Sequence, residues 1–122
     1  MSKIPVVPKL RLLSSSDFDV ETGPLLDANN AFCAPIRAIF GPHAGDGEES
    51  FDFFVCNAKG LERELTRGDF FGLHYIFVDH YDYRKLRLMI EKLGTRCMAD
   101  TWNEAAEKLS KYARWEFDDY RP

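Results

Sequence analysis

The sequence has few of the features that mark several common classes of protein. Only three of its 122 residues are cysteine, and none stands in a Cys-x-x-Cys pair. No apolar run approaches the roughly 20 residues of a membrane-spanning helix, and residues 1–5 lack the apolar stretch of a signal peptide. These absences predict a cytoplasmic protein that has no membrane partner and whose cysteines are reduced thiols.

An excess of positive charge is also missing. Lys and Arg total 16 against 20 Asp and Glu, so the formal net charge is -4 at pH 7. Proteins that bind nucleic acids or anionic membranes by general electrostatic attraction are usually basic, because they must neutralise phosphates. The charge balance therefore argues against a nucleic acid and against a membrane as partner.

Hydrophobic and aromatic residues, in contrast, are plentiful. They make up 45% and 14% of the chain, with ten phenylalanines, and a disordered chain would hold far fewer. A chain of this length can bury a core without help from disulfides or metals. We therefore expect residues 1–122 to form a single domain.

Alternating apolar residues predict strands in the first two thirds of the chain. Residues 32–40 and 51–55 both alternate, and the turn-rich segment 41–49 between them predicts an antiparallel pair. The proline-containing segment 4–12 suits an edge strand. Residues 70–78 form the most apolar run, and we expect them to be a central strand that is buried on both faces.

Two helical patterns follow in the last third. In the first, apolar residues recur every three or four positions, with Asp82 as the expected N-cap and Gly94 as the stop. The second pattern runs over residues 101–117 and opens with Thr101 and Glu104, which have the spacing of a capping box.

Together these elements predict an α+β fold: an antiparallel sheet of about four strands with two C-terminal helices packed on one face. Residues 57–68 are ambiguous and could contain a further short helix. An edge strand also leaves a homodimer open as a form of assembly.

No motif in the sequence points to catalysis or to a cofactor. His43, His74 and His80 lie far apart and lack the spacing of metal ligands. The acidic residues at 46–49 lack the order of an EF-hand loop. The glycines between 41 and 47 do not open a helix with Lys and Ser or Thr behind them, as a phosphate-binding loop would. We therefore predict no enzymatic activity, no cofactor and no bound metal.

One segment has an uneven charge. From Ala38 to Ala58 there is no Lys or Arg. The same segment holds four carboxylates: Asp46, Glu48, Glu49 and Asp52. These carboxylates could keep a hairpin loop solvated, or they could form a docking surface for a basic partner, because complementary charges speed encounter. Both interpretations stay open at this point.

Seven blocks of residues stand in a distinctive order along the chain. They are Ile39–Pro42, Gly47–Cys56, Tyr75–Val78, Tyr81–Tyr83, Thr101–Ala106, Lys108–Ser110 and Trp115–Tyr120. In this order and spacing the sequence resembles the Imm8 family of bacterial immunity proteins. The resemblance covers residues 32–120, and the segment before it matches only loosely.

The resemblance implies a small α+β protein that is encoded beside a polymorphic toxin. Such a protein binds the toxin domain in the cytoplasm of the producing cell and inhibits it by stoichiometric protein–protein binding, without catalysis. From the charge pattern, we assign toxin binding to Asp46, Glu48, Glu49 and Asp52. We expect the family's aromatic residues to lie in the core: Phe51, Phe53, Trp102, Trp115, Phe117 and Tyr120. The resemblance does not identify the toxin.

Two other functions are compatible with the sequence. One is a small-molecule-binding or enzymatic α+β domain, and a deep pocket with a perturbed histidine would support it. Its pocket would be lined by His74, Tyr75, His80, Tyr81 and Tyr83. The other is an interaction subunit that has no toxin as partner, which the neighbouring gene would reveal.

Overall fold

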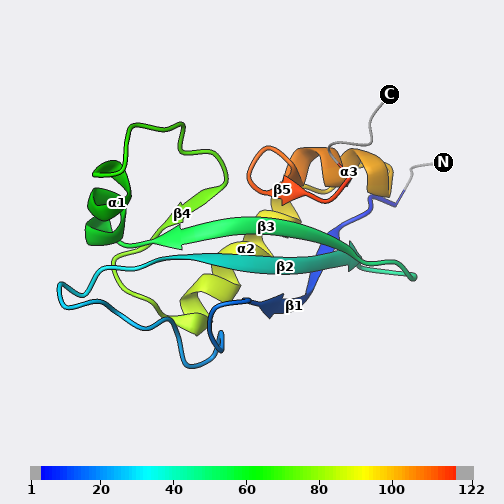
Figure 1. Ribbon diagram of the computed structural model, residues 1–122. Helices are drawn as coiled ribbons and strands as arrows, with labels where there is room; N and C mark the ends of the chain where they lie inside the picture. Colours follow the sequence, from blue (N-terminus) through cyan, green and yellow to red (C-terminus); the bar gives the residue numbers. More distant parts are fainter. Residues whose placement is uncertain (1–3, 118–122) are drawn as a thin grey trace.

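The structure, a computed structural model, describes residues 4–117 of the chain. This part is an α+β unit with a mixed five-stranded sheet and three helices (Figure 1). The elements are β1 (Pro8–Ser14), β2 (Cys33–Pro42), β3 (Glu49–Cys56), α1 (Ala58–Leu65), β4 (Tyr75–Phe77), α2 (Tyr83–Arg96), α3 (Trp102–Leu109) and β5 (Arg114–Trp115). The predicted α+β class is confirmed. The predicted number of two helices is wrong, because a third helix, α1, forms in the segment 57–68 that the sequence left ambiguous.

The sheet is not purely antiparallel, which corrects the predicted architecture. Its strand order is β1-β2-β3-β4, and β5 pairs with the first half of β3. The pairs β1–β2, β2–β3 and β3–β5 are antiparallel, whereas β4 runs parallel to β3. Residues 57–74, which include α1, supply the long crossover connection that a parallel pair requires.

One face of the sheet carries the hydrophobic core. Alternate residues of β2 and β3 point into it, and α2 packs Leu86 and Ile90 against them. Figure 1 shows α2 crossing behind the sheet. The core residues of the two central strands are Ile36, Ala38, Phe40, Phe51, Phe53 and Val55. The alternating pattern in the sequence therefore identified the buried face correctly.

The two predicted helix starts are confirmed, but the end of the last helix is not. Asp82 and Thr101 cap α2 and α3, each accepting a hydrogen bond of 3.2 Å from the backbone N–H three residues further on. Helix α3 ends at Leu109 and does not continue to Phe117. The chain turns there and returns to the sheet as β5, which places Trp115 in the core.

Gly94 does not end α2, which continues through it to Arg96. Its role is close packing: a Cβ atom on Gly94 would lie 2.6 Å from the carbonyl oxygen of Pro8 in β1. The glycine thus allows the helix to approach the sheet closely. The sequence suggested that Gly94 ends the helix, but its role is in packing.

The apolar run 70–78 is not a central strand. Only Tyr75–Phe77 form a strand, β4, and it lies at the margin of the sheet. Phe71 before it is 90% exposed, and His74 has a positive φ of 67°, outside the β region. A continuous apolar run indicates a doubly buried strand only where layers cover both faces of the sheet, and Figure 1 shows no helix crossing the second face of the part described.

The aromatic residues assigned to the core divide into three groups. Three of them are buried: Phe51, Phe53 and Trp115. Trp102 is only partly buried and packs at the margin of the core. Phe117 is 42% exposed, so its assignment was wrong, and Tyr120 lies outside the described residues.

The cysteines also differ from expectation. Cys33 and Cys56 face each other across β2 and β3, with Cα atoms 4.2 Å apart, and their sulfurs form a disulfide. Directly opposed residues on antiparallel strands bring their side chains close, whatever their separation in the sequence. The prediction of three reduced thiols is therefore corrected. Cys97 is free and buried, and burial raises the pKa of its thiol, which keeps it a poor nucleophile.

Candidate protein-binding surface

The face of the sheet opposite α2 is open over its middle in the part of the chain described (Figure 1). In the register of β2 and β3, this face carries four cross-strand pairs: Pro35 with Phe54 and Arg37 with Asp52 in the middle, and Cys33 with Cys56 and Ile39 with Ser50 at the ends. An uncovered sheet face meets either water or a partner, and its composition indicates which of the two it suits.

Four aromatic rings gather on the β3–β4 side of this face, three of them around Tyr75. They are Phe54, Phe70, Tyr75 and Phe77, which we call the aromatic ladder. The ring centroid of Tyr75 lies 5.3 Å from that of Phe54, 5.4 Å from that of Phe70 and 6.0 Å from that of Phe77. The parallel register of β3 and β4 places Phe54 beside Tyr75 and so builds the ladder. Phe54 and Phe77 are 45% and 55% exposed, and exposed aromatic rings are typical anchors of protein interfaces.

Beside the ladder the same face has a hollow of about 490 Å³. Ser14–Ser16, His74 and Arg114 contribute to its walls. Within it, the guanidinium of Arg37 donates two hydrogen bonds to Asp52, from Nε to Oδ1 (2.8 Å) and from Nη2 to Oδ2 (3.1 Å). These hydrogen bonds raise the pKa of Arg37. Aromatic side chains next to polar and charged ones match the anatomy of a protein–protein interface.

The four carboxylates assigned to toxin binding have different surroundings in the structure: two form no ion pair with the residues described, and two are bound by other side chains. Asp46 and Glu48 are exposed in the loop between β2 and β3 and form no ion pair within residues 4–117. Glu49, at the start of β3, accepts a hydrogen bond of 2.5 Å from Nε1 of Trp102 in α3. The carboxylate of Asp52 is held by Arg37. Two of the four are thus free for a partner, whereas the other two make contacts within the fold.

The β2–β3 loop is braced from β1, which the sequence did not suggest. Arg11 donates hydrogen bonds to the carbonyl oxygens of Pro42 (2.7 Å) and Gly45 (3.2 Å). The ring of His43 accepts a hydrogen bond from the N–H of Val7 (3.1 Å). The loop therefore presents its free carboxylates on a supported backbone, with one cation beside it.

Replacing Glu49 with alanine should destabilise the protein. Hydrogen bonds to charged groups contribute about 1.5–3 kcal/mol, and because this one is only partly buried, we expect a loss of about 1–2 kcal/mol in the free energy of unfolding. Urea titration with tryptophan fluorescence measures it. Glu48→Ala, at the exposed neighbouring position, is the control and should cost less than about 0.5 kcal/mol. Equal effects of the two changes would contradict a structural role for Glu49.

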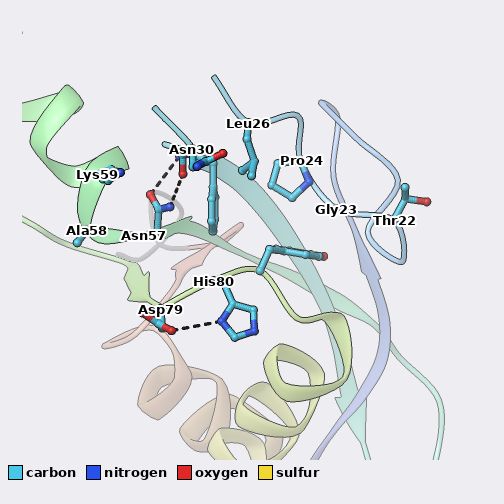
Figure 2. Close-up of a pocket in the computed structure, with 12 residues that line it drawn as sticks. Thr22, Gly23, Pro24, Leu26, Asn30, Asn57, Ala58, Lys59, Asp79 and His80 are labelled. Carbon is cyan, nitrogen blue, oxygen red and sulfur yellow. Dashed lines mark hydrogen bonds and ion pairs between the residues drawn. The ribbon is translucent and has the colours of Figure 1, made fainter. Parts of the chain in front are cut away.

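A second hollow, also of about 490 Å³, lies beside the start of α1 (Figure 2). Its lining includes Lys59, His80 and Tyr81. Figure 2 shows His80 turned toward Asp79, with Nδ1 3.3 Å from the carboxylate. The hydroxyl of Tyr81 donates a hydrogen bond to the carbonyl oxygen of Val20, and burial raises the pKa of Tyr81 to about 12. Tyr81 therefore stays protonated near neutral pH and is a fixed donor that holds the loop before β2.

The pocket that a small-molecule or enzymatic function would require is not assembled. His80 and Tyr81 line the hollow beside α1, whereas His74 lines the hollow on the sheet and Tyr75 belongs to the aromatic ladder. Burial raises the pKa of Tyr75, and the nearby carboxylate of Glu64 adds to this effect. These four of the five residues of that alternative thus occupy separate places in the fold.

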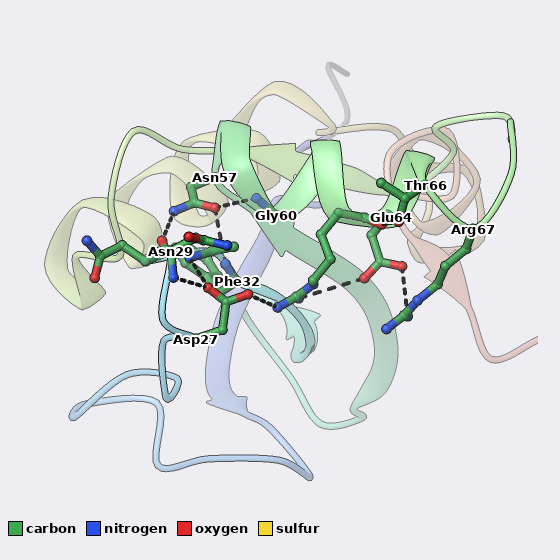
Figure 3. A network of polar contacts seen from close by, with 11 residues as sticks. Asp27, Asn29, Phe32, Asn57, Gly60, Glu64, Thr66 and Arg67 are labelled. Carbon is green, nitrogen blue, oxygen red and sulfur yellow. Dashed lines mark hydrogen bonds and ion pairs between the residues drawn. The ribbon is translucent and has the colours of Figure 1, made fainter.

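A polar network fastens the loop before β2 to α1 (Figure 3). Asn57, the N-cap of α1, accepts hydrogen bonds from the N–H groups of Gly60 (2.8 Å) and Phe32 (3.1 Å). Asp27 pairs with Arg63 of α1 at 3.1 Å. Backbone N–H groups that follow Asp27, and then Arg63, lower the pKa of its carboxyl. Sequence reasoning missed this network, although an Asn ahead of a helix and an Asp ahead of two Asn are local cap and turn signals.

Within residues 4–117 there is no group of three or more His, Cys, Asp or Glu side chains that could hold a metal ion. None of the helices described is both long and apolar enough to cross a membrane. The open sheet face, by its exposed rings, is the strongest candidate for a binding site.

Comparison with known protein families gives a match over most of the chain. The family model Imm8, described as Immunity protein 8, matches residues 9–120. No curated protein and no solved structure matches the chain.

Proposed function

Because the chain belongs to the Imm8 family of immunity proteins, we propose that it binds the toxic domain of a cognate bacterial toxin and inhibits it in a stoichiometric complex. The family match over residues 9–120 carries this proposal. The aromatic ladder supports it, because an inhibitor that acts by binding alone needs exposed anchors on a rigid element.

Inhibition by binding alone requires high affinity for the toxin and a large area of contact with it. A nanomolar complex corresponds to a binding free energy of about -12 kcal/mol, which usually involves about 1,200–2,000 Å² of buried surface. On the open sheet face, Phe54 and Phe70 would fill hollows of the toxin, while Arg37 and Asp52 would pair with polar groups around them. The protein would act in the cytoplasm of the producing bacterium, where the toxin would otherwise attack its own cell.

The acidic β2–β3 loop has a supporting role in this proposal. Of the four carboxylates assigned from the sequence, Asp46 and Glu48 are free to attract a basic surface of the toxin. Glu49 would contribute mainly by holding the start of β3 against α3, whereas Asp52 would act together with Arg37 on the open sheet face. A toxin with a basic substrate cleft would meet carboxylates where substrate phosphates otherwise bind, and attraction between opposite charges would speed the encounter.

The test is to express the chain with the toxin domain encoded beside it. We expect a one-to-one complex on size exclusion and survival of cells that the toxin alone kills. In the variant Asp46→Lys with Glu48→Lys, the association rate should fall by about tenfold or more at low salt, because steering is reversed. The wild-type rate should decrease as salt rises, since ions screen exposed charges.

The matched control is Glu21→Lys with Asp100→Lys, which makes the same change in net charge at two exposed positions elsewhere. It should change the association rate by less than about twofold. Absence of any complex with the wild-type chain would refute toxin neutralisation. A complex with an unchanged rate for the loop variant would refute only the role of the loop.

A further inference from the structure

A second apolar surface lies between the end of β4 and α2. Here Phe77, Leu88 and Met89 line a groove of about 280 Å³, with buried Leu86 beneath them. Leu88 and Met89 are 50% and 47% exposed, although they stand in the middle of a helix. Large apolar side chains that are neighbours on a helix normally pack against another element. The groove meets the aromatic ladder only at Phe77.

The helix beside this groove is strongly basic within an acidic protein. Five cations stand on α2, namely Arg84, Lys85, Arg87, Lys92 and Arg96, against the single acid Glu91. Arg87 is paired with Glu91 at 2.8 Å. Lys85 and Lys92, which line the groove, form no ion pair with any residue that the structure describes. The chain as a whole has a net charge of -4, so this concentration of positive charge is local.

The spacing of the groove residues on α2 indicates which kind of partner segment could bind there. Lys85, Leu88 and Lys92 are three and four residues apart, so they lie one above the other on successive turns of α2. A complementary segment would carry a carboxylate, an apolar side chain and a second carboxylate at the same spacing. An amphipathic helix provides this pattern at positions i, i+3 or i+4, and i+7.

We propose that the groove between β4 and α2 binds an acidic amphipathic helix of a partner protein. Its apolar side chain inserts between Phe77 and Met89, and its carboxylates meet Lys85 and Lys92. Asp79 and Asp82 also line the groove, at the end where α2 begins. A nucleic acid fits less well, because its continuous run of phosphates would be repelled there, whereas a helix can place its carboxylates at Lys85 and Lys92 alone. This proposal does not depend on toxin neutralisation, because the groove shares only Phe77 with the aromatic ladder and no residue with the β2–β3 loop.

The test uses the purified protein and a synthetic probe peptide of about 18 residues, long enough to form a helix. Its apolar residues stand at helical spacing with glutamates on both sides, and a twin peptide has lysines in place of the glutamates. By fluorescence anisotropy, we expect the acidic peptide to bind with a Kd of about 10–100 μM. It should also shift the NMR signal of the Met89 methyl group. The twin should bind at least about tenfold more weakly.

Two variants and a control locate the site. Lys85→Glu with Lys92→Glu should weaken the acidic peptide by at least about tenfold. Met89→Gln removes apolar contact without changing charge and should weaken it as well. The control, Lys9→Glu with Lys111→Glu, makes the same change in net charge at exposed positions elsewhere and should have an effect of about twofold or less. Glutamate has nearly the helix propensity of lysine, so α2 should remain folded, as circular dichroism would verify.

Three results would overturn the proposal: no binding of the acidic peptide, equal binding of both peptides, or unchanged binding by the double variant. The proposal would also be overturned if a short oligouridine or phosphatidylserine vesicles bound through the same lysines more tightly than the acidic peptide does. Such a result would mean that the lysines bind phosphate groups and not a protein helix. The toxin takes no part in this experiment. A negative result therefore leaves toxin neutralisation standing, and a failure of the toxin to bind would leave the groove proposal standing.

Discussion

Replacing Phe51 with alanine should lower the free energy of unfolding by about 3–5 kcal/mol, as large core truncations do. The side chain is fully buried on β3. Its ring lies edge-on to Phe40 at 5.7 Å between centroids and stacks on Trp115 at 6.3 Å. Truncation would leave a cavity where the sheet and β5 meet. Because domains of this size are stable by only about 5–15 kcal/mol, the loss would remove a large share of the stability.

Urea unfolding followed by tryptophan fluorescence measures this loss, since Trp115 stacks directly on the deleted ring. The control is Phe54→Ala, which removes the same side chain from the same strand but on the open face, where it is 45% exposed. We expect Phe54→Ala to lower the free energy of unfolding by less than about 1.5 kcal/mol, because a half-exposed side chain gains only part of the free energy of burial. Equal losses at the two positions would mean that the face with Phe54 is as well packed as the core.

The largest expected effect on function comes from the aromatic ladder. Changing Phe54 and Phe70 together to serine should weaken toxin binding by at least about 100-fold, since anchor residues contribute about 2 kcal/mol or more each and about 1.4 kcal/mol corresponds to tenfold. Both rings contact Tyr75 on the open sheet face, and neither lines the groove beside α2. Calorimetry with the toxin domain and a protection assay in cells measure the loss.

A matched pair separates this effect from a general loss of surface hydrophobicity. Leu25→Ser with Tyr112→Ser removes two exposed side chains outside the ladder and should leave the affinity within about threefold. Thermal unfolding of both double variants shows whether either has lost its fold. Full protection by a folded ladder variant would exclude the open sheet face as the toxin-binding surface, and the exposed faces of the helices would become the next candidates.

Local signals predicted the parts of this protein that local physics controls. The alternation over residues 32–40 and 51–55 identified β2, β3 and the face that they bury, because side-chain direction reverses at each step of a strand. Asp82 and Thr101 were recognisable as caps because each satisfies an N–H only three residues away. Most of the residues that resemble Imm8 lie in these same elements, which is consistent with the family match over residues 9–120.

The candidate site was harder to predict, because its parts are distant in the sequence. Four carboxylates in a segment without Lys or Arg suggested a uniformly acidic surface. In the fold, Arg11 reaches the loop from β1, Trp102 binds Glu49 from α3, and Arg37 holds Asp52 from the neighbouring strand. Sequence composition counts charges along the chain, whereas a binding surface depends on which charges remain unpaired after folding.

By itself, the sequence determined the α+β class, the core face of the central hairpin, the helix starts and the family. Only the tertiary structure decided that β4 runs parallel at the margin of the sheet, that Cys33 meets Cys56, and that four aromatic rings gather on an open face. The physical reason is the range of the interactions. Periodicity and caps act within one or two turns of the chain, whereas strand register joins residues that are tens of positions apart and sets which side chains face solvent together.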